Sequence, residues 1–360
     1  MESLLEQIKV LARKASTNLS TLQIQIDSSV LNECFCFSTS LNKQKFHSAS
    51  VGKMMTMVLI VQAIEKGLID WTSPICRFLD AKLLEGLFIF EEKDYSKQVT
   101  VSHLLSHTSG INDYFDGEST MDPPFIDQVI ADPDKFYTPS DLLSITRTTQ
   151  KAIGAPDDAF LYSDTGYVLL GLLAETLYHK SFYEILNEQI FRPLRMFDTS
   201  FAFYDPKFRQ EDLGPIILEG TDIRRFRSLS ADFSGGGLST TAPDLTLFLK
   251  AMHKNQLITA ESLKKIAIFE NHFEAGMFYG FGLMELRFEK FFFLLRGLPR
   301  LYGHLGILGV HAWWNPKTGD TYVINVGNRD QIVPSFKLLI QVVTLIEKTR
   351  KSADKTVPVR

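Results

Sequence analysis

Long apolar runs, paired cysteines and an excess of basic charge are all scarce in this 360-residue sequence. No stretch approaches the roughly 18 uninterrupted apolar residues that a membrane span needs, and the densest runs, VLIVQAI and FFFLL, have the length of core segments. Charged side chains interrupt the first 16 residues and exclude the apolar centre of a secretory signal. We therefore expect a cytoplasmic protein with no membrane span.

The number of cysteines and the net charge argue against a disulfide-stabilised protein, a cysteine metal site and a nucleic-acid-binding protein. The three cysteines, Cys34, Cys36 and Cys76, cannot all pair, and no second Cys or His pair completes a metal site beside Cys34 and Cys36. We interpret all three as reduced packing residues. A formal net charge of -4 and a pI near 6.1 give no reason to expect a nucleic-acid partner.

The pattern of apolar residues predicts an α/β (α+β) chain, with an antiparallel sheet flanked by helices. Strand and helix patterns at both ends suggest a discontinuous sheet domain, residues 1-75 and 205-360, into which a mostly helical region, 76-204, is inserted. We expect the active site between the two. The individual helices are expected at residues 3–14, 50–66, 99–107, 139–148, 164–180, 181–191, 241–254 and 335–348. The strands are expected at 22–26, 34–38, 278–286, 290–296, 307–314 and 321–328.

The stretch FHSASVGKMMT holds a candidate nucleophile and base, Ser50 and Lys53. The spacing alone is weak, because Ser40–Lys43, Ser262–Lys265 and Ser352–Lys355 match it too. Only Ser50 and Lys53 stand at the first turn of a strongly apolar helix. Residues three apart on a helix are neighbours, so the amine can reach the hydroxyl. Burial and the positive end of the helix dipole should both lower the pKa of Lys53 until its amine acts as a base.

A simpler interpretation of these residues is structural. Ser50 could cap the helix while Lys53 extends to solvent.

Two further residues could belong to the same active site. Tyr162, just before a helix that Asp164 could cap, would present its hydroxyl from a fixed loop and could shuttle a proton. His304, between Gly303 and Gly306 at the start of a strand, could lie where the backbone approaches a ligand closely. Singly, each is more often a structural residue.

With Ser50, Tyr162 and His304 in this order, the sequence resembles the serine β-lactamase-related family of class C β-lactamases, family VIII carboxylesterases, D-aminopeptidases and penicillin-binding-protein-like hydrolases. Three short stretches carry the resemblance: Ser50-Val51-Gly52-Lys53, Tyr162-Ser163-Asp164 and His304-Leu305-Gly306. Longer similarities extend it over nearly the whole chain: VSHLLSHTSGI (101–111), IFRPLRMFDTSF (190–201), GGGLSTTAPDL (235–245) and YGFGL (279–283).

The resemblance implies a β-lactamase/transpeptidase-like fold and a role for each matching residue. Ser50 would be the acylated nucleophile, Lys53 its base and Tyr162 the proton shuttle, with no metal or organic cofactor needed. The oxyanion would lie against the backbone N–H groups of Ser50 and Ile307, with His304 and Gly306 on the same substrate-binding strand. His107 is interpreted as structural. Lys317-Thr318-Gly319 spells a motif of penicillin-recognising enzymes, but it follows Pro316 in a turn and should face solvent.

Two departures from the family pattern bear on the substrate. Asp164 replaces an asparagine; its carboxylate could pair with Lys53, favour a substrate amine or cap its helix. His304 and Leu305 replace the Lys-Thr pair that would hold a β-lactam carboxylate, so penicillin turnover should be poor.

We expect a serine hydrolase of esters or small amides. The alternatives are a β-lactamase or D-Ala-D-Ala carboxypeptidase/D-aminopeptidase, and a non-catalytic binding or scaffold protein. An apolar pocket is expected, because Phe291, Phe292, Phe293 and Tyr302 lie near His304 in the sequence, although these rings could equally pack in the core.

Overall fold

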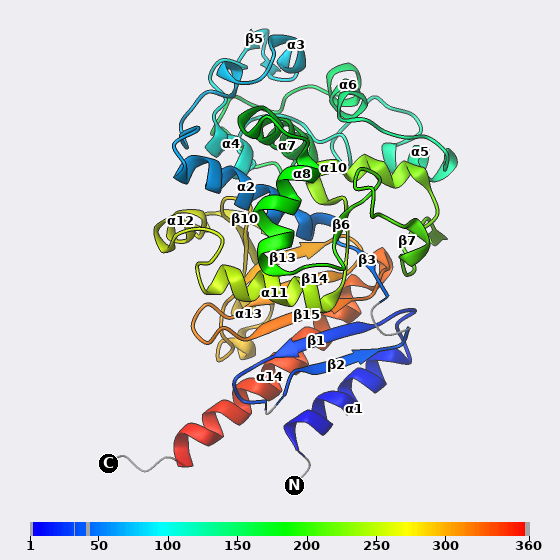
Figure 1. The fold of residues 1–360 in the computed structure, drawn as a ribbon, viewed down its shortest axis with the longest axis vertical. Coiled ribbons are helices and arrows are strands. Elements are labelled where there is room, and N and C mark those ends of the chain that lie inside the picture. The colour runs from blue at the N-terminus through cyan, green and yellow to red at the C-terminus, as the bar shows by residue number, and fades with distance from the viewer. Residues whose placement is uncertain (1–2, 32, 41–43, 357–360) are drawn as a thin grey trace.

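A computed structural model describes residues 3–31, 33–40 and 44–356. Its centre is an eight-stranded sheet whose neighbouring strands all run antiparallel, in the order β10-β11-β12-β13-β14-β15-β1-β2 (Figure 1). The sheet and the helices around it confirm the expected fold class. The strands are β1 Gln23–Asp27, β2 Phe35–Ser38, β10 Asn271–Glu274, β11 Met277–Tyr279, β12 Met284–Leu286, β13 Leu301–Gly306, β14 Val310–Trp314 and β15 Thr321–Asn325.

Helices cover both faces of the sheet. Helices α1 (Leu4–Ser16) and α14 (Ile332–Thr356) pack against each other on one face, and α11 (Ala242–His253) packs on β1, β14 and β15. Side chains alternate along a strand, so neighbouring residues enter opposite core layers. On β14, Trp313 joins the core with α1 and α14, whereas Trp314 joins the core on the other side. Both indoles are fully buried, and all five residues of β14, including His311, are buried.

The second layer is mostly helical and lies over the face with α11, at the upper end of Figure 1. Helix α2 (Lys53–Glu65) runs between the two layers, and nearly all of its side chains are buried. The remaining α-helices are α3 Ala81–Leu84, α4 Val101–Leu105, α5 Phe125–Ala131, α6 Pro139–Thr149, α7 Asp164–Tyr178, α8 Phe182–Leu186, α9 Arg192–Leu194, α10 Phe233–Gly236, α12 Ala260–Ile266 and α13 Phe288–Phe291. The division of the chain at residues 75 and 205 stays a prediction.

Short elements join these layers. A three-stranded sheet in the order β3-β9-β6 leads the chain into α2. The short strands are β3 Phe46–His47, β4 Ile89–Phe90, β5 Lys93–Asp94, β6 Ser200–Phe201, β7 Ile217–Leu218, β8 Thr221–Asp222 and β9 Leu238–Thr240. The 3₁₀ turns are η1 Ala49–Gly52, η2 Ile75–Arg77, η4 Gln210–Asp212, η5 Arg227–Asp232, η6 Phe293–Leu295 and η7 Arg329–Gln331, and η3 Asn187–Phe191 is a π-helical turn.

Three expectations about local structure are wrong. Residues 290–296 form the end of α13 and the turn η6 instead of a strand, and Phe292 and Phe293 are exposed on the outer surface. Those rings therefore do not line a pocket. Cys34 and Cys36 are also exposed, so they are not packing residues, whereas Cys76 is half-buried.

The helices of the described residues include none that could cross a bilayer: even the 25-residue α14 fails the combined requirement of length and apolar character.

Candidate active site

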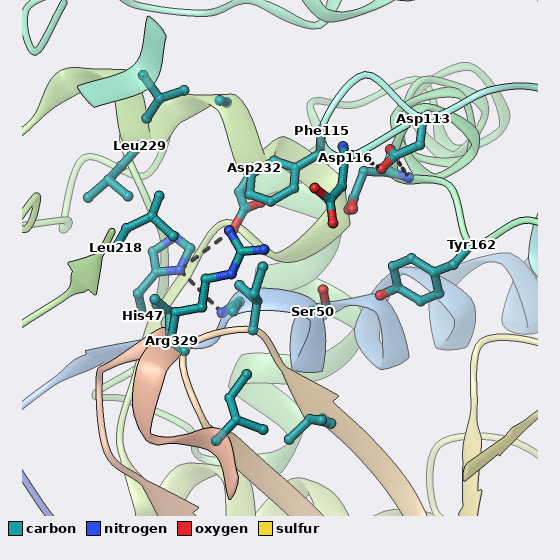
Figure 2. A pocket seen from close by; sticks show the side chains of 18 of the residues that line it. His47, Ser50, Asp113, Phe115, Asp116, Tyr162, Leu218, Leu229, Asp232 and Arg329 are labelled. Carbon is teal, nitrogen blue, oxygen red and sulfur yellow. Dashed lines mark hydrogen bonds and ion pairs between the residues drawn. The ribbon is translucent and has the colours of Figure 1, made fainter. Parts of the chain in front are cut away.

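Ser50 lies in the 3₁₀ turn η1, directly before α2 (Figure 2). Two glycines allow this turn to approach α10. A Cβ on Gly52 would lie 2.9 Å from Gly236 Cα, and a Cβ on Gly236 would lie 2.3 Å from Ala49 O. The Ser48 hydroxyl donates to Gly236 O at 2.7 Å and fixes the turn. Gly52, not Ser50, is the N-cap of α2, so the structure does not support the capping role for Ser50.

Lys53 is the first residue of α2, and its side chain is fully buried. It does not extend to solvent. Its Nζ donates to the Asp164 carboxylate, to Gly235 O at 2.9 Å and to Ser50 Oγ at 3.2 Å. Three acceptors match the three N–H groups of an ammonium ion. A neutral amine fits the same position, because it could donate to Asp164 and Gly235 O while its lone pair accepts the Ser50 proton.

The expected lowering of the pKa of Lys53 is wrong for the resting site. Burial by itself lowers this pKa, as the sequence suggested, but the charge of the Asp164 carboxylate opposes burial, and Tyr162 adds to that effect. The net result is a pKa above the ordinary lysine value. Lys53 is therefore held as an ammonium ion and has to lose a proton before it can act as a base.

Asp164 is the first residue of α7 and is buried. Of the three roles considered for it, the structure shows the pairing with Lys53; the helix cap is Ser163, whose hydroxyl accepts from Gly166 N. Gly235 makes room for the carboxylate, because a Cβ there would lie 2.5 Å from Asp164 Oδ1. Burial raises the pKa of Asp164, and the charge of Lys53 opposes that rise.

Tyr162 lies beside this pair, with the centre of its ring 4.8 Å from Lys53 Nζ. Figure 2 shows its hydroxyl directed toward Ser50. Burial raises the pKa of the phenol above its ordinary value, and the charge of Lys53 opposes that rise. His107 supports the ring: the ring centroids lie 4.4 Å apart, and His107 Nδ1 accepts from Ser163 N at 2.9 Å. That placement agrees with a structural role for His107.

The end of β13 reaches the same site. A Cβ on Gly306 would lie 2.9 Å from both Ala49 Cβ and Ser48 O, so a glycine is needed for the strand to pack against η1. Ile307, the next residue, lines the cavity together with Ser50. His304 is fully buried behind the cavity, where its Nε2 lies 3.4 Å from Tyr279 Oη. The ring of His304 is not part of the cavity lining, and the expected place of its strand beside the substrate stays a prediction.

A cavity of about 420 Å³ opens beside Ser50, and most of its lining is apolar. In Figure 2, Tyr162 and His47 lie on opposite sides of Ser50. Residues 291–293, Tyr302 and Lys317 are not part of the lining, and Lys317 is exposed in the turn between β14 and β15, as expected. The charged side chains of the lining are five acids and one arginine: Asp113, Asp116, Asp164, Asp232, Glu274 and Arg329.

Sequence reasoning missed most of these charged residues. Asp113 is the clearest case: it is buried, and its Oδ1 accepts from Asp164 N at 2.8 Å. Burial, and then the charge of Asp164, raise the pKa of Asp113 to about 7. Its position two residues after the VSHLLSHTSGI stretch was the available signal. His47 was missed as well; its Nδ1 accepts from Ala49 N at 3.2 Å, and burial lowers its pKa to about 4.

Comparisons with known proteins show which proteins this chain is similar to. A family model described as Beta-lactamase matches residues 42–347. A probable fimbrial assembly protein, FimD of serogroup H1 from Dichelobacter nodosus, is 27% identical over 263 residues, which are 70% of this chain and 59% of that protein. The chain thus spans little more than half the length of this curated relative.

Solved structures share the fold over almost the whole chain. The D-amino acid amidase from Ochrobactrum anthropi SV3, complexed with L-phenylalanine amide, superposes with a TM-score of 0.78 and 21% identity, covering 97% of this chain and 100% of that one. EstCE1, a hydrolase with promiscuous acyltransferase activity, superposes with a TM-score of 0.75 and 15% identity, covering 96% and 98%.

Proposed function

Because the chain belongs to the beta-lactamase family, we propose that it is a serine hydrolase that cleaves esters or small amides through an acyl-enzyme on Ser50. The family match confirms the resemblance read from the three motifs. The observation that carries the proposal is the position of Lys53 Nζ, which contacts Ser50 Oγ, Asp164 and Gly235 O at once. A lysine that only stabilised the fold would not need the serine among its partners.

The proposed reaction follows from these contacts. Lys53, once it has lost a proton, accepts the Ser50 proton while Ser50 Oγ attacks the substrate carbonyl carbon. The backbone N–H groups of Ser50 and Ile307 would stabilise the oxyanion. As the tetrahedral intermediate collapses, the C–O or C–N bond breaks and the leaving group takes a proton from Lys53 through the Tyr162 hydroxyl. Water then attacks the acyl-enzyme while Lys53 accepts its proton. As the second tetrahedral intermediate collapses, the bond between the acyl carbon and Ser50 Oγ breaks, and Ser50 Oγ takes that proton back from Lys53.

Covalent labelling tests the nucleophile. We expect a fluorophosphonate to add once to the protein, and peptide mapping of the adduct by mass spectrometry to place it on Ser50. Ser262, which also lies three residues before a lysine on a described helix, should stay unlabelled, because it does not line the cavity beside Ser50. No adduct would favour the binding or scaffold alternative. An adduct on another serine would reject the proposed site.

The charge of the cavity bears on the substrate. Asp164 is paired with Lys53 and the pKa of Asp113 is about 7, so the excess negative charge of the lining comes from Asp116, Asp232 and Glu274 against Arg329. This excess should disfavour the carboxylate of a β-lactam or of a D-Ala-D-Ala peptide and favour a neutral or cationic substrate. This supports esterase or D-amino acid amidase activity over β-lactamase or carboxypeptidase activity. The D-amino acid amidase named above has the same fold, which is compatible with a substrate that carries an amino group.

Matched esters test the charge preference. We expect p-nitrophenyl 4-aminobutyrate to be cleaved with a kcat/KM about tenfold above that of p-nitrophenyl hemisuccinate, with the butyrate between them. The ratio should fall with added salt, because ions screen the field of exposed carboxylates such as Asp116. Asp116→Asn should lower the ratio several-fold, whereas Asp70→Asn, at an exposed aspartate away from the cavity, should leave it unchanged. Faster cleavage of nitrocefin than of all three esters would reverse the order of the alternatives.

A further inference from the structure

The turn that joins α13 to β13 carries three consecutive large apolar side chains on the outer surface. Phe292, Phe293 and Leu294 are 59%, 62% and 71% exposed, and we call them the aromatic turn. The other exposed large apolar side chains of the described residues are scattered along the sequence: Val10, Leu68, Ile89, Ile153, Phe197, Leu247, Ile268 and Val333. Exposure of three adjacent apolar side chains to water is unfavourable, and the packing of the fold gives no reason for it.

The aromatic turn is held in place from below. Phe288, the first residue of α13, is fully buried, and Phe291 packs its ring against Phe336 of α14 with centroids 5.6 Å apart. A Cβ on Gly276 would lie 2.4 Å from the Phe291 ring, so the chain at residue 276 has to be glycine for Phe291 to seat. The base of the segment is thus part of the core, while its tip projects from it.

Basic residues flank the aromatic turn on both sides. Lys290 precedes it, Arg296 follows it, and the guanidinium of Arg296 lies 4.7 Å from the centre of the Phe293 ring. Lys351, from the C-terminal part of α14, donates to Gly297 O at 3.0 Å and brings a third cation to the segment. Arg300 is nearby but is engaged by Glu285 and Glu289.

The size and charge of this surface favour one occupant. Three partly exposed side chains of this kind offer on the order of 300 Å² of apolar area, well short of the roughly 800 Å² per partner of a stable protein–protein interface. Aromatic and leucine side chains flanked by lysine and arginine are typical of segments that enter the headgroup region of a bilayer. We propose that the aromatic turn docks the protein on the surface of an anionic lipid membrane, as a contact and not as a span.

The two parts of the surface have separate roles. The rings and Leu294 would enter the boundary between headgroups and acyl chains, where burial of apolar area is favourable. Lys290, Arg296 and Lys351 would lie at the level of the phosphates, where each basic residue near an anionic surface contributes and the effect fades within a Debye length. Neither part alone gives stable binding, so the two should act together.

Co-sedimentation with vesicles tests the proposal. The full chain is mixed with vesicles of phosphatidylcholine containing about 30% phosphatidylserine, or of phosphatidylcholine alone. We expect partitioning to the anionic vesicles to be about tenfold stronger, and to weaken in about 0.5 M NaCl. Phe292→Ser/Phe293→Ser/Leu294→Ser should lower partitioning about tenfold or more, and Lys290→Glu/Arg296→Glu should remove the preference for anionic lipid.

A control variant tests whether binding depends on the aromatic turn or on exposed apolar side chains in general. Leu68→Ser/Phe197→Ser/Leu247→Ser removes the same residue types from three unrelated exposed positions and should leave partitioning unchanged. All variants should keep the unfolding temperature and the labelling of Ser50, which shows that they are folded.

Three outcomes would overturn the proposal. The first is absence of vesicle binding by the parent chain, and the second is equal loss in both triple variants. The third is a dimer, detected by light scattering, that only the aromatic-turn variant dissolves; this would assign the surface to a second copy of the chain.

Discussion

Replacing Lys53 with methionine is expected to lower the rate of Ser50 acylation by about 10³-fold or more, with KM changed only a few-fold, because a positioned base contributes up to about 10⁴-fold to proton transfer. Methionine has a similar length and fits a fully buried position, but it offers no lone pair on nitrogen to the Ser50 proton. The burst of p-nitrophenol from an activated ester measures acylation directly, and the steady-state rate gives KM.

The chain supplies a matched control for this experiment. Ser262 and Lys265 have the same spacing as Ser50 and Lys53, but they lie on α12, away from the cavity. Lys265→Met should therefore leave the burst unchanged, and Ser50→Ala should abolish it. Removing Lys53 leaves Asp164 buried without its cation, which should cost stability, so the assay needs a parallel unfolding curve. Acylation of a folded Lys53→Met variant at the parental rate would remove Lys53 from the mechanism.

The main elements of the fold were predictable because their apolar patterns are regular. The strands expected at residues 22–26 and 34–38 correspond to β1 and β2, and the helix expected at 241–254 corresponds to α11. The strand predicted at residues 290–296 is wrong, although its phenylalanines are residues that favour strands in general. In this fold Phe292, Phe293 and Leu294 are exposed, so the apolar character of this run does not reflect packing in the core.

The site was predictable only in part, and the reason is physical. Ser50 and Lys53 are one turn apart, so their contact follows from local geometry. The charge of Lys53 does not, because it depends on Asp164, 111 positions further along the chain. The same holds for Asp113, whose carboxylate meets the start of α7 only after the helical layer has folded. Local pattern establishes which groups are present, while distant contacts decide their ionisation.

Replacing Asp164 with asparagine is expected to move the acidic limb of the pH–kcat/KM profile to lower pH by at least about one unit, and to raise kcat/KM near pH 7 by about tenfold for each unit. The Asp164 carboxylate holds the pKa of Lys53 above its ordinary value, so the free amine is scarce at neutral pH and the parental activity should keep rising above pH 10.5. Asparagine keeps an oxygen acceptor for Lys53 Nζ and removes the charge. Burial, which lowers the pKa of Lys53, then prevails.

The other groups that face Lys53 have to be separated from Asp164 in this experiment. They are Tyr162 and Tyr167, whose rings lie 4.8 and 5.4 Å from its Nζ, the buried imidazoles of His107 and His304, and the carboxylates of Asp113 and Asp232. Asp113 matters most, because its pKa of about 7 would fall once the charge of Asp164 is removed. Asp113→Asn alone should delete any titration near pH 7 and leave the alkaline rise in place.

A second buried aspartate provides the control for charge removal as such. Asp244 accepts from Thr199 Oγ1 at 2.7 Å, and burial raises its pKa, but its carboxylate does not contact Lys53. Asp244→Asn should therefore leave the pH profile in place. An acidic limb that stays where it was in Asp164→Asn would show that the free amine of Lys53 is not the form that takes the Ser50 proton. The ammonium would then act only as a fixed charge beside the nucleophile, and the base would have to be sought among the other groups around Ser50.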